Sequence, residues 1–235
     1  MIINLKDKTA LVCGSTQGIG NAIATQFASC GANVILLARN EDKLKSALSK
    51  LPNNSSQSHS ILIADFSSLE SVQAVASQVA SMAIDILVNN TGGPAAGKAI
   101  DADISAYLSA FNAHLINNQI LTQAVVNGMR SRSFGRVINI ISTSVKVPLP
   151  NLGVSNTIRG AVGNWSKTIA NELAADGITV NNILPGATQT ERLSSIISNK
   201  SEKLNKDLQV IEDGMLAEIP MKRFGKPRRA TCRCM

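Results

Sequence analysis

The sequence predicts an α/β fold, a doubly wound parallel sheet formed by one domain over residues 1–235. Short apolar runs that suit strands alternate with helical patterns along the whole chain, as in α/β domains. Glycine or polar residues follow almost every apolar run. A length of 235 residues and an apolar content of 44% suit a single domain with a large core.

The first element pair surrounds a glycine-rich turn. An apolar run at 9–13 precedes the turn Gly14-Ser-Thr-Gln-Gly18-Ile-Gly20, and a second apolar run occupies 34–37. Between them, helical spacing places Ile19, Ile23 and Phe27 on one face. Such a turn brings bare backbone N–H groups and a helix N-terminus close to a dinucleotide pyrophosphate. A glycine triplet alone is also typical of an ordinary strand–turn–helix, so the rest of the chain must decide.

The remaining elements continue the alternation. Each later apolar run is short and bounded by turn-forming or polar residues, such as the segment 52–59 or the pair Pro185-Gly186. The further strands are expected at 60–64, 84–88, 136–141 and 178–184. The helices between them are expected at 41–50, 69–82, 103–131 and 155–175. Strands this apolar suit a parallel sheet that is covered on both faces.

Polar and glycine residues gather where the predicted strands end. These residues are Gly14, Arg39, Asp65, Asn89-Asn90, Ser142 and Pro185-Gly186. Ligands of open α/β sheets bind beyond the carboxyl ends of the strands. Six such ends of the same character predict a ligand-binding domain.

Together these motifs resemble the short-chain dehydrogenase/reductase family over about residues 5–227, and most closely its 3-oxoacyl-carrier-protein reductase branch. The resemblance implies a cofactor site in the glycine turn, after the third and fourth strands, and in a Pro-Gly-x-x-x-Thr segment after the sixth. The implied residues are Gly14, Ser15, Gln17, Gly18, Ile19, Gly20, Asp65, Phe66, Asn90, Gly92, Pro185, Gly186, Thr188 and Thr190. It also implies oxidoreduction of a small carbonyl or alcohol substrate.

The second strand ends in Ala38-Arg39-Asn40, without the acidic residue that would bind the ribose 2′-hydroxyl of NAD. A guanidinium matches a phosphate in a bidentate manner. We therefore expect the chain to prefer NADP(H), with Arg39 at the 2′-phosphate, while NAD(H) remains possible.

The catalytic positions depart from the family. Its serine matches Ser142, but its tyrosine and lysine positions hold Ser155 and Arg159, and its asparagine position holds His114. In the family the tyrosine donates a proton to the carbonyl oxygen, and the lysine lowers the tyrosine pKa and binds the nicotinamide ribose. Tyr107, the one tyrosine of the chain, lies near one end of a predicted helix, where a packing role is expected.

The motif therefore does not identify the proton donor. Ser155 is too weak an acid, and Arg159 can bind the ribose but stays protonated. His114, which titrates near neutrality in ordinary surroundings, and Lys146 are the candidates. Each also has a non-catalytic interpretation. His114 would then be a hydrogen-bonded histidine of the helix, and Lys146 would be a solvated lysine of a loop. The alternative to an enzyme is a nucleotide-binding relative without turnover, with a regulatory or scaffold role.

The charge distribution and the cysteines argue against a nucleic-acid-binding protein and against a zinc protein. The net charge of +7 comes mostly from six basic residues between 222 and 233, and the remainder has 17 basic residues against 16 acidic ones. With 3% aromatics, nucleic-acid binding is not favoured. Cys232 and Cys234 lack the second ligand pair of a zinc site, so no metal is expected. Neither a signal peptide nor a membrane helix is predicted, which favours the cytoplasm.

The resemblance also implies a homodimer through the helices 103–131 and 155–175. The segment 188–218 is expected to form a substrate lid. The tail 228–235 is atypical and reads like a truncation, without the family's seventh strand. The sixth strand should then be an edge of the sheet.

Overall fold

The computed structural model describes residues 3–54 and 56–231, and the side chains up to residue 229. One parallel sheet has the strand order β3-β2-β1-β4-β5-β6. Its strands are β1 (Thr9–Cys13), β2 (Asn33–Ala38), β3 (Ser60–Ile63), β4 (Ile86–Asn89), β5 (Gly135–Ile140) and β6 (Ile178–Ile183). The predicted doubly wound α/β fold is confirmed. Within the described ranges no seventh strand pairs with β6, which is an edge.

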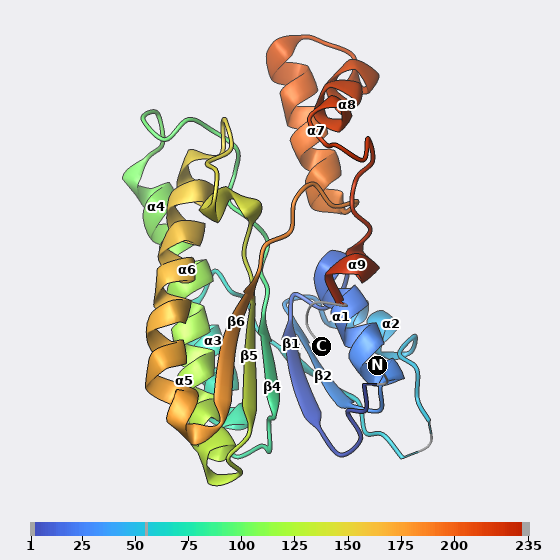
Figure 1. Cartoon of the computed structure of the whole chain (residues 1–235), viewed down its shortest axis with the longest axis vertical. Helices are drawn as coiled ribbons and strands as arrows, with labels where there is room; N and C mark the ends of the chain where they lie inside the picture. Colours follow the sequence, from blue (N-terminus) through green and yellow to red (C-terminus); the bar gives the residue numbers. More distant parts are fainter. Residues whose placement is uncertain (1–2, 55, 232–235) are drawn as a thin grey trace.

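Helices cover both faces of the sheet (Figure 1). They are α1 (Gly18–Ser29), α2 (Glu41–Leu48), α3 (Leu69–Val79), α4 (Ile104–Phe111), α5 (Asn117–Ser131), α6 (Gly153–Leu173), α7 (Glu191–Leu204), α8 (Leu208–Ala217) and α9 (Pro227–Thr231). Alternation along β1 divides the core between the faces: Leu11 packs among residues of α3, α5 and α6, and Val12 among residues of α1 and α2.

The helix predicted over 103–131 is not one regular helix. It consists of α4, a π-helical segment η1 (Asn112–Ile116) and α5. The predicted long helix is therefore present, but its π-helical segment was not foreseen, because neither proline nor glycine marks the change in hydrogen bonding. π segments inside helices often occur at functional sites, and this one carries His114.

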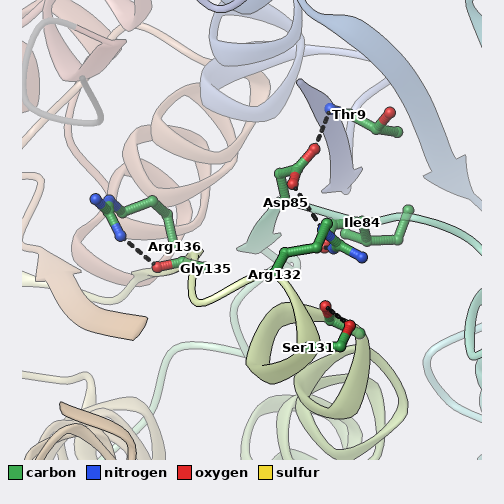
Figure 2. Close-up of polar contacts among 8 residues, drawn as sticks. Thr9, Ile84, Asp85, Ser131, Arg132, Gly135 and Arg136 are labelled. Carbon is green, nitrogen blue, oxygen red and sulfur yellow. Dashed lines mark hydrogen bonds and ion pairs between the residues drawn. The ribbon is translucent and has the colours of Figure 1, made fainter. Parts of the chain in front are cut away.

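Asp85 joins the amino ends of the central strands (Figure 2). Its buried carboxylate accepts hydrogen bonds from the backbone N–H of Thr9 at 2.9 Å and from Nε of Arg132 at 3.2 Å. Arg132 also donates to the carbonyl oxygen of Ile84 at 2.6 Å. The expected start of the fourth strand at 84 was therefore two residues too early, since Ile84 and Asp85 form this junction and β4 begins at Ile86.

At the opposite ends of the strands, asparagines form hydrogen bonds across the sheet. Asn89 donates its amide to Asn139 at 2.8 Å, and Asn139 donates to Asn182 at 3.2 Å and to Ser166 of α6 at 2.9 Å. The three asparagines are register partners on β4, β5 and β6. This ladder fixes the carboxyl ends of three strands and the helix α6 against one another, directly below the loop that carries Ser142.

The helices α7 and α8 stand beyond the carboxyl ends of the strands (Figure 1). They pack on each other around Leu193, Ile197 and Ile211, with Phe224 from the following segment. The chain then returns to α1, on which α9 lies. None of the described helices is both long and apolar enough to span a membrane.

Candidate active site

The glycine turn requires glycine at two positions because the backbone packs closely there. A Cβ on Gly20 would lie 2.2 Å from the carbonyl oxygen of Gly14, and one on Gly14 would lie 2.6 Å from that of Asn90. Gly14 also has φ +58°, a conformation that favours glycine. The amide of Asn90 donates to the carbonyl oxygens of Cys13 and Gly14, at 3.2 Å each. Asn90 therefore holds the turn in shape.

The turn leads into α1, whose first residues have neither a side-chain cap nor an acidic residue. Its first N–H groups remain available for an anion. Two of the predicted cofactor residues have partners within the protein. Ser15 is fully buried, and its hydroxyl is 3.5 Å from the carbonyl oxygen of Leu37. The amide of Gln17 donates to Glu191 at 2.7 Å instead of standing free.

Arg39 and Asp65 lie next to each other at the ends of β2 and β3. Hydrogen bonds from the N–H and hydroxyl of Ser67 lower the pKa of Asp65, and the charge of Arg39 adds to this shift. Arg39 is exposed at the end of its strand. Phe66 follows Asp65, and its carbonyl oxygen accepts from the amide of Asn117 at 2.8 Å. An exposed guanidinium and an ionised carboxylate therefore flank one end of the site.

The start of α7 closes over the glycine turn. Thr190 caps α7, and a Cβ on Gly18 would lie 3.2 Å from its methyl group. The segment before it is held from two sides: the N–H of Thr143 donates to Pro185 at 3.2 Å, and Thr188 forms a β-bridge with Gly225. Two other predicted glycines are less crowded. A Cβ on Gly92 would have no atom within 4 Å, and a Cβ on Gly186 would contact only the Thr143 methyl group, at 3.9 Å.

The residues in the family's catalytic positions lie near the ends of β4 and β5. The hydroxyl of Ser142 accepts a hydrogen bond from the N–H of Ser144 at 3.1 Å and caps the 3-10 segment η2 (Thr143–Val145). Lys146 follows that segment and is exposed. Ser155 is half-buried on α6, one turn before Arg159. Tyr107 packs against the cluster of Ala110, Val154 and Ile158, which confirms its packing role.

Arg159 is a buried cation. The residue is 8% exposed, and its Nη1 donates to the carbonyl oxygen of Ile140 at 3.0 Å. Burial and the charge of Arg192 lower the pKa of Arg159 to about 10, so the group remains protonated at neutral pH.

His114 is held in the π segment by a hydrogen bond between its Nδ1 and the hydroxyl of Thr91. Burial, and then the charges of Arg159 and Arg192, lower the pKa of His114 from 6.5 to about 3. The expectation that His114 titrates near neutrality is therefore wrong. At neutral pH the imidazole is uncharged and can act only as a hydrogen-bonding group.

Arg192 is a site residue that the sequence analysis missed. It lies in the first turn of α7, and its Nη2 donates to the carbonyl oxygen of Pro94 at 2.6 Å, beside Gly93. Its charge acts on both Arg159 and His114. Three nitrogen-rich side chains, from the π segment, α6 and α7, thus lie within electrostatic range of one another.

The described residues contain no group of three or more potential metal ligands. Cys232 and Cys234 lie outside them. A dinucleotide, in contrast, fits the residues present: the glycines let the turn pack tightly at the start of α1, and α1 has an uncapped N-terminus without an acidic residue, which suits a pyrophosphate.

The family comparison agrees with this geometry. Residues 8–201 match the short chain dehydrogenase family model. The chain belongs to the short-chain dehydrogenase/reductase family. By this membership it is an NAD(P)-dependent oxidoreductase.

Curated members of the family cover almost the whole chain. The NADPH-dependent reductase BacG of Bacillus subtilis is 29% identical over 94% of this chain and 86% of its own length. The 3-oxoacyl-[acyl-carrier-protein] reductase FabG of Rickettsia bellii is 31% identical over 96% of this chain and 87% of its own length. The ketoacyl-reductase-like character predicted from the motifs is confirmed.

Solved structures show the same likeness. L-sorbose reductase of Gluconobacter frateurii, complexed with NADPH and L-sorbose, superposes with a TM-score of 0.90 at 30% identity, covering 100% of this chain and 90% of its own. A putative NAD(P)-dependent gluconate 5-dehydrogenase of Beutenbergia cavernae with bound NADP reaches a TM-score of 0.87 at 25% identity, covering 98% and 89%.

Proposed function

We propose that this protein is an NADPH-dependent reductase of a small carbonyl compound. The observation that carries the proposal is the cofactor end of the site. An open glycine turn leads to an uncapped helix N-terminus, and the exposed Arg39 ends β2 without an acidic neighbour at 38–40. Relatives that use or bind NADPH support the choice of cofactor.

Each part of the site has a distinct task in this proposal. Arg39 binds the 2′-phosphate, Asp65 and Phe66 adjoin the adenine, and the turn with the α1 N-terminus binds the pyrophosphate. The segment from Pro185 to Thr190 borders the nicotinamide. When bound, NADPH supplies the hydride.

The protein must then polarise the carbonyl group and supply a proton. Ser142 and the neutral imidazole of His114 act as hydrogen-bond donors, as an uncharged imidazole can polarise a carbonyl. Arg159 stabilises the negative charge that develops on the oxygen, with its charge fixed over the whole working range. Lys146 is the remaining candidate proton donor, because it is exposed and follows Ser142 by four residues.

Binding and turnover are tested separately. Fluorescence titration should give tighter binding of NADPH than of NADH, and Arg39→Asp should narrow or reverse this preference. Equal affinities of the wild-type protein for both cofactors would contradict the assignment of Arg39.

Turnover is tested by following NADPH oxidation with a panel of ketones. Activity should be weak because the family's tyrosine is absent, and general acid catalysis contributes about 10²–10⁴-fold. The paired reversion Ser155→Tyr with Arg159→Lys should raise the rate. A double variant that binds NADPH but reduces no ketone would favour the second candidate function, a nucleotide-binding protein without turnover. The loss of the Tyr/Lys pair is what supports that candidate.

We also infer that the chain forms a homodimer through α4, α5 and α6. Ile104, Leu108 and Phe111 share one face of α4 and are 73%, 60% and 38% exposed, which is unusual for a monomer surface. The pair α7–α8 is proposed as the substrate lid, since α7 borders the site from above.

A further inference from the structure

We propose that Arg159 and Arg192, beside the imidazole of His114, form a binding site for a carboxylate group of the substrate, so that the preferred substrates are short oxo acids. This inference rests on the proposed reductase function and names its substrate class. The inference predicts that the protein binds free oxo acids more tightly than their esters or thioesters, because esters and thioesters lack the negative charge of the carboxylate.

The first argument is the absence of a counterion. The three ion pairs among the described residues join Lys45 with Glu41, Arg130 with Asp176, and Arg132 with Asp85. Neither Arg159 nor Arg192 takes part in them. The nearest acid in sequence to Arg192 is Glu191, and its carboxylate accepts a hydrogen bond from Gln17. Two neighbouring cations therefore have no anionic partner in the described part of the chain.

The second argument is burial with unused donors. A guanidinium has five N–H donors, and Arg159, which is only 8% exposed, forms one hydrogen bond to the described part of the chain, with Ile140. His114 is 2% exposed, and its Nδ1 bonds to Thr91, while its Nε2 has no partner among the described residues. A buried guanidinium with unused donors and no counterion is unfavourable, so the arrangement is expected to bind an anion.

The third argument is the position of the cluster relative to the cofactor groups. The cofactor's phosphates are assigned to the glycine turn, the α1 N-terminus and Arg39. Thr190 contacts that turn at Gly18, whereas Arg192 contacts the loop after β4, at Gly93 and Pro94. Its charge acts on His114 and Arg159, which come from other elements. The charges therefore converge where the substrate carbonyl must lie.

A carboxylate suits this cluster better than a neutral group does. Planar guanidinium groups bind carboxylates in a bidentate manner, and two of them on different elements can hold one carboxylate from two sides. Arg159 belongs to α6 and Arg192 to α7, so the bound acid would join the body of the domain to the proposed lid. The carbonyl must reach Ser142 at the same time, which places it within a few bonds of the carboxylate.

The test compares acids with their esters on the full-length protein saturated with NADPH. Calorimetric titrations use 2-oxobutanoate and 3-oxobutanoate, each beside its methyl ester. Arg192→Met removes the charge at similar length, and Arg192→Lys keeps it. Lys200→Met is the matched control, because it removes an exposed positive charge from the same helix.

For at least one oxo acid, we expect tighter binding than for its ester by on the order of tenfold to a hundredfold. Arg192→Met should abolish that difference, Arg192→Lys should restore part of it, and Lys200→Met should leave it unchanged. NADPH affinity should stay the same in all three variants.

Two results would overturn the inference. Acids and esters could bind equally well to the wild-type protein, or Arg192→Met could weaken NADPH itself, which would assign the anion site to a cofactor phosphate. Titrations without NADPH separate this inference from the proposed function. Binding of an acid, lost in Arg192→Met, by a protein that does not bind NADPH would support the anion site and refute the reductase assignment.

Discussion

The low pKa of His114 predicts that the folded protein is sensitive to acid. In the unfolded chain a histidine takes up a proton near its ordinary pKa of 6.5, whereas burial and the two arginines hold the folded value at about 3. Between these values the unfolded state binds more protons than the folded state. This contribution to stability is therefore complete above about pH 6.5 and is lost progressively as the pH falls toward 3.

The magnitude follows from the size of the shift. One pKa unit corresponds to about 1.4 kcal/mol, so the full shift of His114 is worth about 4–5 kcal/mol by pH 3. About 2–3 kcal/mol of this should already be lost at pH 4.5. That is a large part of the stability of a typical domain.

The assay is urea denaturation of the wild-type protein and His114→Asn at pH 7.5 and pH 4.5. Asparagine keeps a polar side chain that can bond to Thr91 but does not titrate. The wild-type protein should lose about 2–3 kcal/mol more than the variant on acidification. In NMR spectra, the His114 ring should show no titration between pH 5 and 8, with His59→Gln used to assign the signals of the two histidines. A midpoint of His114 near 6.5, or equal acid sensitivity of the two proteins, would refute this reasoning and return the imidazolium to the list of proton donors.

The remaining predictions concern the Asp85 junction of the sheet, the glycine turn, the proton donor and the oligomeric state. Asp85→Ala should lower the free energy of unfolding by about 2–4 kcal/mol in urea melts, since it leaves Arg132 and a strand N–H unpaired; an unchanged melt would contradict this. Gly20→Ala should abolish NADPH binding or folding, whereas Gly214→Ala, whose Cβ meets nothing within 4 Å, should not alter fluorescence titrations. Lys146→Met should slow NADPH oxidation without weakening NADPH binding, and an unchanged rate would exclude this lysine as the donor. Light scattering should give a dimer, and a stable tetramer would argue against β6 as a free edge.

The fold could be predicted because its signals are local. Apolar runs with turn residues on both sides define strands, and helical spacing between them requires crossovers and hence a parallel sheet. Errors occurred where tertiary contacts take over. The two residues before β4 form the junction of Asp85 instead of extending the strand, and the π segment within 103–131 has no breaker residue to announce it.

The site was predictable only in part, for a related reason. The glycine turn lies within one short segment, whereas Arg192 is 98 residues from its hydrogen-bond partner Pro94. Sequence spacing cannot reveal such a contact. One signal was nevertheless present. A positive charge in the first turn of a helix opposes the helix dipole, so Arg192 at the start of α7 is a residue without a local structural reason.

The replacements at 114 and 159 are best understood together. A buried lysine can lose its proton, and a family site with Tyr and Lys uses such adjustable pKa values. Arginine keeps its charge when buried, as Arg159 does with a pKa of about 10. Burial keeps His114 neutral, and the fixed charges of Arg159 and Arg192 add to this effect. On the proposed assignment of the catalytic positions, the site has exchanged groups that transfer protons for groups that hold charge. We infer that reversion of Arg159 to lysine alone cannot restore proton transfer, because Ser155 offers no phenol, while it would weaken the hold on an anion. Only the paired reversion with Ser155→Tyr should recover a fast reductase, and it should do so with a diminished preference for acids.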